Sequence, residues 1–243
     1  MNRSLQSGVS LITGLLMGLS LSACASTGIT ISPPSAYVKF HAQMGTYVPP
    51  IAMPPTPDRV QVLIQDGSGN CVQTLALLSR LIDVIDHPDD LTNRDTWTKL
   101  RACSSEWVLP QPAAERIREY KIYGPQNGNY NAILIADDQS TTSSNALVDN
   151  LTIDAEFPVG AVGTPVQAHK ADTILRDGNN TLLTTERGTF GHLSFTPTVL
   201  NLSATPPQGM GTFQFLAGNK ADMTDRRVLI VLDGSFTIQP DRP

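Results

Sequence analysis

The chain has 243 residues, and its 17 basic and 22 acidic residues give a formal net charge of −5 at pH 7. The basic residues are scattered and form no stripe that could displace counterions from phosphates, which excludes a nucleic-acid partner. Charged residues make up only 16% of the chain, a balance that favours turns and polar-faced strands over long surface helices.

Residues 1–23 have the anatomy of a secretory signal peptide. They carry one early positive charge at Arg3, no acidic residue, and an apolar run from Leu11 to Leu21. Two other interpretations are an ordinary cleaved signal and a membrane helix. The apolar run is short for a bilayer span, which needs about 20 residues. These residues therefore predict export of the rest of the chain from the cytosol.

The motif Leu21-Ser22-Ala23-Cys24 at the end of this run resembles the lipobox of bacterial lipoproteins. The resemblance implies that Cys24 becomes the first mature residue and carries diacylglycerol and palmitate chains, so that the lipid bilayer is a partner. Acyl chains contribute about 0.8 kcal/mol per buried methylene, and two or three of them anchor a domain stably. Ala25 and Ser26 follow, where an Asp would favour the inner membrane, so the resemblance implies the outer membrane facing the periplasm.

Residues 24–58 are expected to form a proline-rich tether between the membrane and the folded part of the chain. Proline fixes φ and removes a backbone donor, so the segment favours an extended, poorly paired conformation. Its aromatic residues Tyr37, Phe40 and Tyr47 support an alternative in which part of the segment packs on the domain or on a partner. The prolines are Pro33, Pro34, Pro49, Pro50, Pro54, Pro55 and Pro57.

Residues 59–243 are expected to form a single α+β domain that begins with a helical part at 59–125. A buried strand at 59–65 ends in a turn at 66–70. The spacing of Leu75, Leu78, Ile82 and Ile85 then predicts a helix over 71–86. A second helix, capped by Asp89 or Asp90, is expected to run to about Ser104, and a third over 112–123.

The β-rich part is expected at 130–240, where alternating apolar residues and turn signals recur. The expected strands cover 131–136, 147–157, 164–176, 181–186, 189–202, 211–216 and 227–239. Strands this regular predict an antiparallel β-sandwich or barrel-like portion. The expected fold class is therefore α+β, with a disulfide-stapled helical layer followed by this antiparallel portion.

Two cysteines remain if Cys24 carries lipid, and an exported pair most simply forms a disulfide. Cys71 would open the first predicted helix and Cys103 would close the second, and the two ends meet in an antiparallel helical hairpin. In the chain-entropy model the cross-link would stabilise the fold by about 3 to 4 kcal/mol.

The segment from Gln65 to Cys71 is similar to the active-site helix of papain-like cysteine hydrolases, although Val72 stands where that family has an aromatic residue. The resemblance implies that Cys71 is a nucleophile, Gln65 an oxyanion donor, and His169 or His192 the base. Asn179 or Asn201 would orient the base. The alternative function is therefore a papain-like hydrolase of peptide or peptidoglycan amides, which requires a reduced Cys71.

No cofactor or metal ion is expected, because the four histidines lie far apart in the sequence. Four acidic residues at the turn between the first two predicted helices could contact a hard cation, but they are also typical of a solvated helix end. They are Asp83, Asp86, Asp89 and Asp90. The preferred function is a non-enzymatic binding or assembly component of the cell envelope, with an envelope protein as a possible partner.

Overall fold

The computed structural model describes residues 37–108, 117–137, 147–158, 160, 163–164, 166–167, 169–201 and 208–238. The predicted signal peptide and Cys24 lie outside these ranges. None of the helices in the described part of the chain is long and apolar enough to cross a bilayer.

Thirteen strands and two helices account for the regular structure of the described residues. The strands are β1 (Tyr37–Val48), β2 (Arg59–Gln65), β3 (Cys71–Leu77), β4 (Ser105–Val108), β5 (Ile117–Gln126), β6 (Asn129–Asp137), β7 (Val148–Pro158), β8 (Val166–Gln167), β9 (Lys170–Leu175), β10 (Leu182–Thr184), β11 (His192–Asn201), β12 (Gln208–Gly218) and β13 (Arg227–Ile238). The helices are α1 (Leu78–Asp86) and α2 (Leu91–Ala102).

The predicted α+β fold class is wrong, because the described chain is mainly one antiparallel sheet with only two helices. The residues from Cys71 to Leu77 form strand β3 and not the first half of a helix. A short apolar run fits both periodicities, and pairing with β2 decides the outcome here. Where a third helix was expected, Ile117–Gln126 forms strand β5, in keeping with its Ile and Tyr residues.

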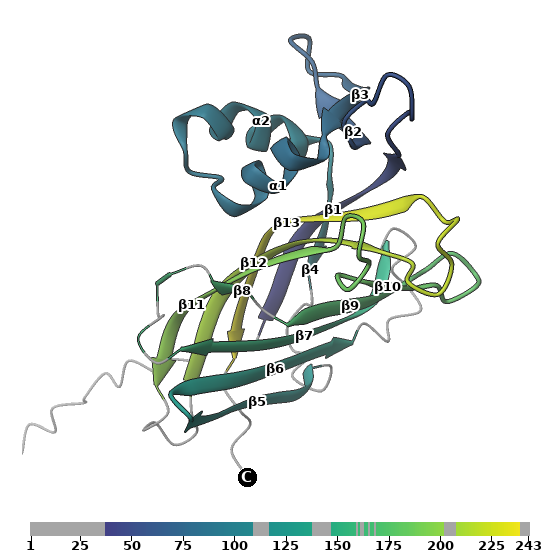
Figure 1. The fold of residues 1–243 in the computed structure, drawn as a ribbon. Helices are drawn as coiled ribbons and strands as arrows, with labels where there is room; N and C mark the ends of the chain where they lie inside the picture. Colours follow the sequence, from purple (N-terminus) through teal and green to yellow (C-terminus); the bar gives the residue numbers. More distant parts are fainter. Residues whose placement is uncertain are drawn as a thin grey trace, which may run out of the picture. The chain divides into compact units, whose positions relative to one another are not determined.

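Neighbouring strands in the sheet are hydrogen-bonded in the order β3-β2-β1-β13-β12-β10-β9-β7-β6-β5 (Figure 1). Strands β3 and β5 lie at the two ends of this path. Strand β11 pairs with β12 and β8, and β4 pairs with β1. Beside β13, strand β1 has two partners along its other side, β4 at Lys39–Ala42 and β2 at Thr46–Val48. The sheet therefore forks along β1, and β2 with β3 forms one branch of the fork.

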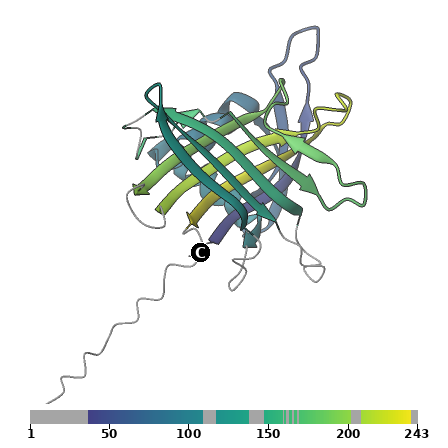
Figure 2. The ribbon, with the colours of Figure 1, turned by 90° about the horizontal axis from the view of Figure 1, so that it is seen from below.

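Two groups of strands face each other across the larger apolar core. Figure 2 shows the teal strands β5–β7 crossing the lime and yellow strands β11–β13 at a steep angle. Side chains from both groups belong to one buried cluster, so they cover each other's apolar faces. Members of the cluster include Phe40, Leu134, Leu151, Ile153, Phe195, Phe213, Phe215 and Val231.

Strand β1 lies within the segment that was expected to form the tether, and its residues belong to the sheet. Phe40 is buried, with its ring stacked on Trp107 at 4.6 Å between centroids. Tyr47 packs against Phe190 at 5.1 Å and donates a hydrogen bond to Asp58. Phe40 and Tyr47 of this segment thus pack on the domain, as the alternative interpretation proposed.

A second buried cluster holds the two helices on the forked end of the sheet. Leu81, Val84 and Ile85 of α1 and Leu100 of α2 contribute to it. Their partners on the strands are Val60, Val62, Leu216, Val228, Ile230 and Leu232. Figure 1 shows both helices beside β2 and β3. The helices therefore cover one face of β2 and reach Ala76 of β3, while Val72 and Thr74 on the same face of β3 stay exposed.

Candidate functional site

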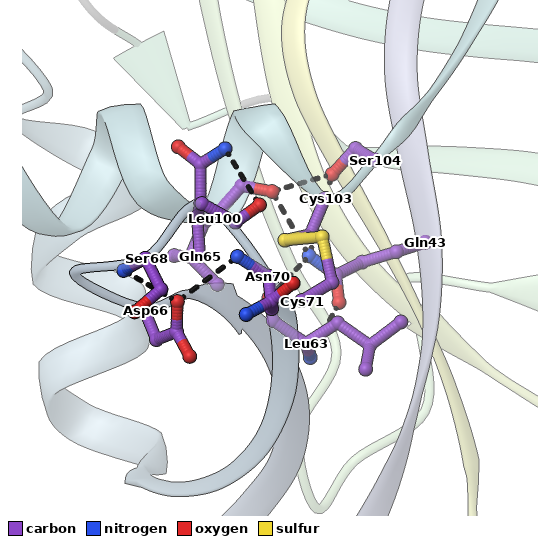
Figure 3. Close-up of a disulfide and its surroundings, with 11 residues drawn as sticks. Gln43, Leu63, Gln65, Asp66, Ser68, Asn70, Cys71, Leu100, Cys103 and Ser104 are labelled. Carbon is purple, nitrogen blue, oxygen red and sulfur yellow. Dashed lines mark hydrogen bonds between the residues drawn. A yellow bond between two sulfur atoms is a disulfide. The ribbon is translucent and has the colours of Figure 1, made fainter.

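The β2–β3 ribbon, defined as Arg59–Gln65 and Cys71–Leu77, is joined by a compact turn. The Asp66 carboxylate accepts hydrogen bonds from the backbone N–H groups of Ser68 (2.8 Å) and Asn70 (2.9 Å), as Figure 3 shows. These backbone donors, first of all that of Asn70, lower the pKa of Asp66 below its ordinary value. Gly69 has a φ of +83°, a conformation that glycine adopts without strain. The turn predicted at 66–70 is therefore confirmed.

The predicted disulfide between Cys71 and Cys103 is confirmed, with a Cα–Cα distance of 5.7 Å (Figure 3). It joins the first residue of β3 to the residue that follows α2. The helical hairpin that suggested this pair is only partly present, because Cys71 lies on a strand. The disulfide therefore fixes the outer strand of the ribbon to the helix that supports it.

The side chain of Gln43 holds the ribbon to β1 at the fork. Its Oε1 accepts the Leu63 N–H at 2.8 Å, and its Nε2 donates to the Leu63 carbonyl at 3.2 Å. The same Nε2 lies 3.2 Å from the Leu100 carbonyl and 3.3 Å from the Ser104 hydroxyl. Backbone pairing of β1 with β2 covers only Thr46–Val48. The Gln43 amide therefore replaces a rung of the ladder where the two strands separate (Figure 3).

The hydrogen-bond pattern of the ribbon shows which backbone groups of β3 point outward. The Asp66 N–H donates to Asn70 O, and the Leu78 N–H donates to Asp58 O, so both of these pairs are hydrogen-bonded. Bonded pairs recur at every second residue of an antiparallel ladder. In the register of β3 with β2, the bonded residues are then Val72, Thr74 and Ala76. The backbone groups of Cys71, Gln73, Leu75 and Leu77 therefore point away from β2.

Strand β3 has β2 as its one strand partner among the described residues. An edge of this kind accepts another strand through its outward N–H and C=O groups. Of the two strands that end the path, β3 has side chains that the structure describes along its whole length. The sequence from Cys71 to Leu77 contains no charged residue, glycine or proline. It lacks the features that commonly protect edge strands from pairing.

The face of the ribbon opposite the helices is open to solvent. Leu75 is 51% exposed and Leu77 is 42% exposed on this face, where Gln61 also donates a hydrogen bond to Gln73. Five of the ten large apolar side chains that the described residues expose lie between positions 51 and 77. They are Ile51, Met53, Val72, Leu75 and Leu77. Only Leu75 and Leu77 lie on this face, because Val72 is on the other face of β3 and Ile51 and Met53 precede β2.

The residues of the hypothetical papain-like site are not brought together. Cys71 is bonded to Cys103 and has no thiol to act as a nucleophile. His192 Nε2 lies 2.6 Å from Asp86 Oδ1, and His169 Nε2 lies 2.9 Å from Glu156 Oε2. Within the described ranges, no contact joins either histidine to Cys71.

The remaining candidates for that site have local roles. The Gln65 side chain donates to the Gly69 carbonyl within the turn. The Asn179 backbone N–H donates to Asp177 in another turn. Asn201 ends strand β11, and its side chain lies outside the described features. The hypothetical oxyanion donor Gln65 and the hypothetical orienting residue Asn179 thus make hydrogen bonds within turns. The side chain of Asn201 is not among those that the structure describes.

The acidic residues near the helices either contact an arginine or histidine side chain or are exposed to solvent. Asp83 lies 2.5 Å from Arg80, and Asp86 contacts His192 as given above. Asp89 and Asp90 are exposed, and Asp90 occupies the predicted position before α2, although its side chain makes no capping hydrogen bond. Among the described residues, no three His, Cys, Asp or Glu side chains are grouped so that they could hold a metal ion.

Sequence reasoning missed one buried titratable group close to the fork. His41 is 8% exposed, and its Nδ1 lies 3.7 Å from Asp233 Oδ2. Arg101 of α2 also contacts Asp233, at 2.8 Å. Burial, and then the positive charge of Arg101, lower the pKa of His41. A histidine in an alternating strand could have indicated an inward position, had β1 been predicted as a strand.

Comparison with known proteins finds no relative of this chain. No family model matches it, and neither a curated protein nor a solved structure matches it. Its function therefore has to be inferred from the N-terminal motif and from the chemistry of the β2–β3 ribbon.

Proposed function

We propose that this protein is a lipid-anchored component of the bacterial cell envelope that binds a protein partner by addition of a strand to β3. The observation that carries the proposal is the edge of β3, where four residues direct N–H and C=O groups outward beside exposed leucines. Main-chain hydrogen bonds would supply affinity, and the alternating side chains would supply specificity. The function is non-enzymatic in this proposal, and its site is the β2–β3 ribbon.

The location in the envelope is supported by two independent features of the chain. The motif at Leu21–Cys24 follows an apolar run with an early positive charge, as in lipoprotein signals. The bond between Cys71 and Cys103 is typical of proteins outside the cytosol, where thiols are oxidised. Both features fit a domain that is anchored to the membrane through lipid on Cys24 and folds in the periplasm. The outer membrane is the proposed site of attachment.

The rigidity of the ribbon also supports a binding role. One face of β2 is packed on α1 and α2, one end of the ribbon is tied by the disulfide, and Gln43 fixes the position of Leu63. A preorganised edge loses little conformational entropy when it pairs with a second strand. The ribbon thus presents its edge in one conformation, which is what strand addition requires.

The test is photo-crosslinking in living cells with a benzophenone amino acid at position 75 of the full-length protein. The proposal predicts an adduct of defined mass from position 75 and none from position 98, an exposed threonine on α2. Replacement Gln73→Pro in the same chain should abolish the adduct. It removes an outward N–H and leaves the backbone bonds to β2 in place, with loss of only the exposed side-chain bond from Gln61. Equal adduct formation from positions 75 and 98 would contradict the proposal.

A further inference from the structure

We infer that the strand added to β3 is the β3 strand of a second copy of this chain, paired antiparallel about a two-fold axis at Thr74. The inference rests on the proposed function, since it names the partner of the same edge. It is carried by the outward hydrogen-bonding groups of β3, by the absence of charge along the strand, and by the match of the strand with itself.

The two-fold axis brings every outward group of one copy opposite an outward group of the other. With Thr74 at the axis, Cys71 pairs with Leu77 of the second copy, and Gln73 pairs with Leu75. All four residues point their backbone groups away from β2. These pairs are therefore of the hydrogen-bonded type, and the two Thr74 residues form a non-bonded pair between them. The whole length of β3 is used without shifting the register.

The electrostatics of the chain favour this edge as the place where two copies meet. Two copies with a net charge of −5 repel each other over most approaches. Strand β3 has no charged side chain, so pairing there buries none.

A two-fold axis perpendicular to a sheet keeps each face on its own side. The combined sheet would have the order β2-β3-β3-β2, with the helices of both copies on one face. The open faces would join into one surface that carries Leu75 and Leu77 of both copies. Such an interface is isologous, which is the commonest kind in homo-oligomers.

The size of this contact sets its expected strength. One seven-residue strand from each copy gives a contact well below the roughly 800 Å² per partner of a standard stable interface. The dimer should therefore be reversible and should increase with protein concentration. Sedimentation equilibrium of the purified full-length protein over a wide concentration range measures this directly.

Covalent trapping with Thr74→Cys tests the geometry. A non-bonded antiparallel pair has Cα atoms about 4.5 Å apart, which a disulfide can bridge. Mild oxidation should give a dimer linked through position 74, located by peptide mapping that also confirms the native Cys71–Cys103 bond. The matched control is Thr98→Cys on α2, which is also exposed and should remain monomeric. A monomer from Thr74→Cys, or equal trapping of both variants, overturns the inference.

A second variant keeps the test independent of engineered thiols. Leu75→Lys adds a charge at an exposed edge position, so folding should be preserved while strand pairing is opposed. Its circular dichroism should match the wild type, and at concentrations where the wild type dimerises it should sediment as a monomer. Undiminished dimerisation of a folded Leu75→Lys protein overturns the inference.

The photo-crosslinking experiment separates failure of the inference from failure of the proposed function. An adduct from position 75 with twice the chain mass supports a second copy. An adduct of another mass, together with a monomeric Thr74→Cys protein, overturns the inference and leaves strand addition standing. Absence of any adduct specific to position 75 contradicts both.

Discussion

Replacing Gln43 by leucine tests how the ribbon is attached to the rest of the sheet. Gln43 is 4% exposed, and its amide is hydrogen-bonded to both the N–H and the C=O of Leu63. Leucine has a similar volume and no polar atom, so both backbone groups of Leu63 would lose this partner. The Leu100 carbonyl would keep its bonds from Cys103 N–H and Ser104 Oγ. Ser104 Oγ would lose the Gln43 donor but keep its own bond to the Leu100 carbonyl, so the loss falls mainly on two groups of β2.

Each unsatisfied buried group costs about 1 to 3 kcal/mol, and Leu63 is only half-buried. We therefore expect Gln43→Leu to lower the free energy of unfolding by about 2 to 4 kcal/mol, nearer the lower value if water reaches Leu63. In a chain of this size the midpoint of thermal unfolding should fall by roughly 2 to 4 °C for each kcal/mol. Thermal and denaturant unfolding followed by circular dichroism measures both quantities.

The matched control is Gln61→Leu on the open face of the ribbon. Gln61 makes one exposed side-chain bond, to Gln73, so its replacement should change stability by less than about 0.5 kcal/mol. If Gln43→Leu is as stable as Gln61→Leu, the assignment of Gln43 as a substitute for a backbone rung is refuted.

Three further predictions follow from the disulfide, the buried histidine and the N-terminal motif. Native protein should resist thiol alkylation at Cys71 and Cys103 unless a reductant is present, and replacing both by alanine should lower the free energy of unfolding by about 3 to 4 kcal/mol; labelling without reductant would contradict the bond. The folded state lowers the pKa of His41, so the unfolded chain binds the proton more readily, and stability should fall as pH decreases below about 6.5. His41→Gln should flatten the denaturant-midpoint profile below about pH 6.5, and an unchanged slope would show that His41 does not cause it. Intact-mass measurement of protein extracted from membranes should show loss of residues 1–23 and the added mass of acyl chains on Cys24, whereas an unmodified chain that retains Met1 would contradict the anchor.

Local signals predicted several elements of the fold correctly. The strand expected at 59–65 is β2, and the turn at 66–70 joins it to the next element. The helix expected from Asp89 or Asp90 is α2, which begins after Asp90. These elements are set by apolar periodicity and by side-chain bonds in turns, both of which operate over a few residues.

Non-local pairing caused the errors. Leu75 and Leu78 lie three residues apart, as on a helix, yet β3 ends at Leu77 and α1 begins at Leu78. Pairing with β2 outweighs the helical spacing there. Strand β1 pairs with β13, almost 200 residues further along the chain, and no local pattern indicates such a partner.

The candidate site was predicted only in part. The count of cysteines and the predicted export led to the pairing of Cys71 with Cys103, which the structure confirms. The role of Gln43 depends on the fork between β2 and β4, so no motif around Gln43 could have indicated it. The exposed edge of β3 was hidden because its residues were assigned to a helix. A strand assignment for Cys71–Leu77 would have shown an uncharged seven-residue edge.

Hydrogen exchange at single-residue resolution gives the most direct test of strand addition at β3. The amides of Gln73 and Leu75 point outward, whereas those of Thr74 and Ala76 are bonded to β2. In native membrane vesicles the amides of Gln73 and Leu75 should exchange at least about tenfold more slowly than in dilute detergent solution, with Thr74 and Ala76 changed much less. Equal exchange of Gln73 and Leu75 in the two preparations would contradict the account.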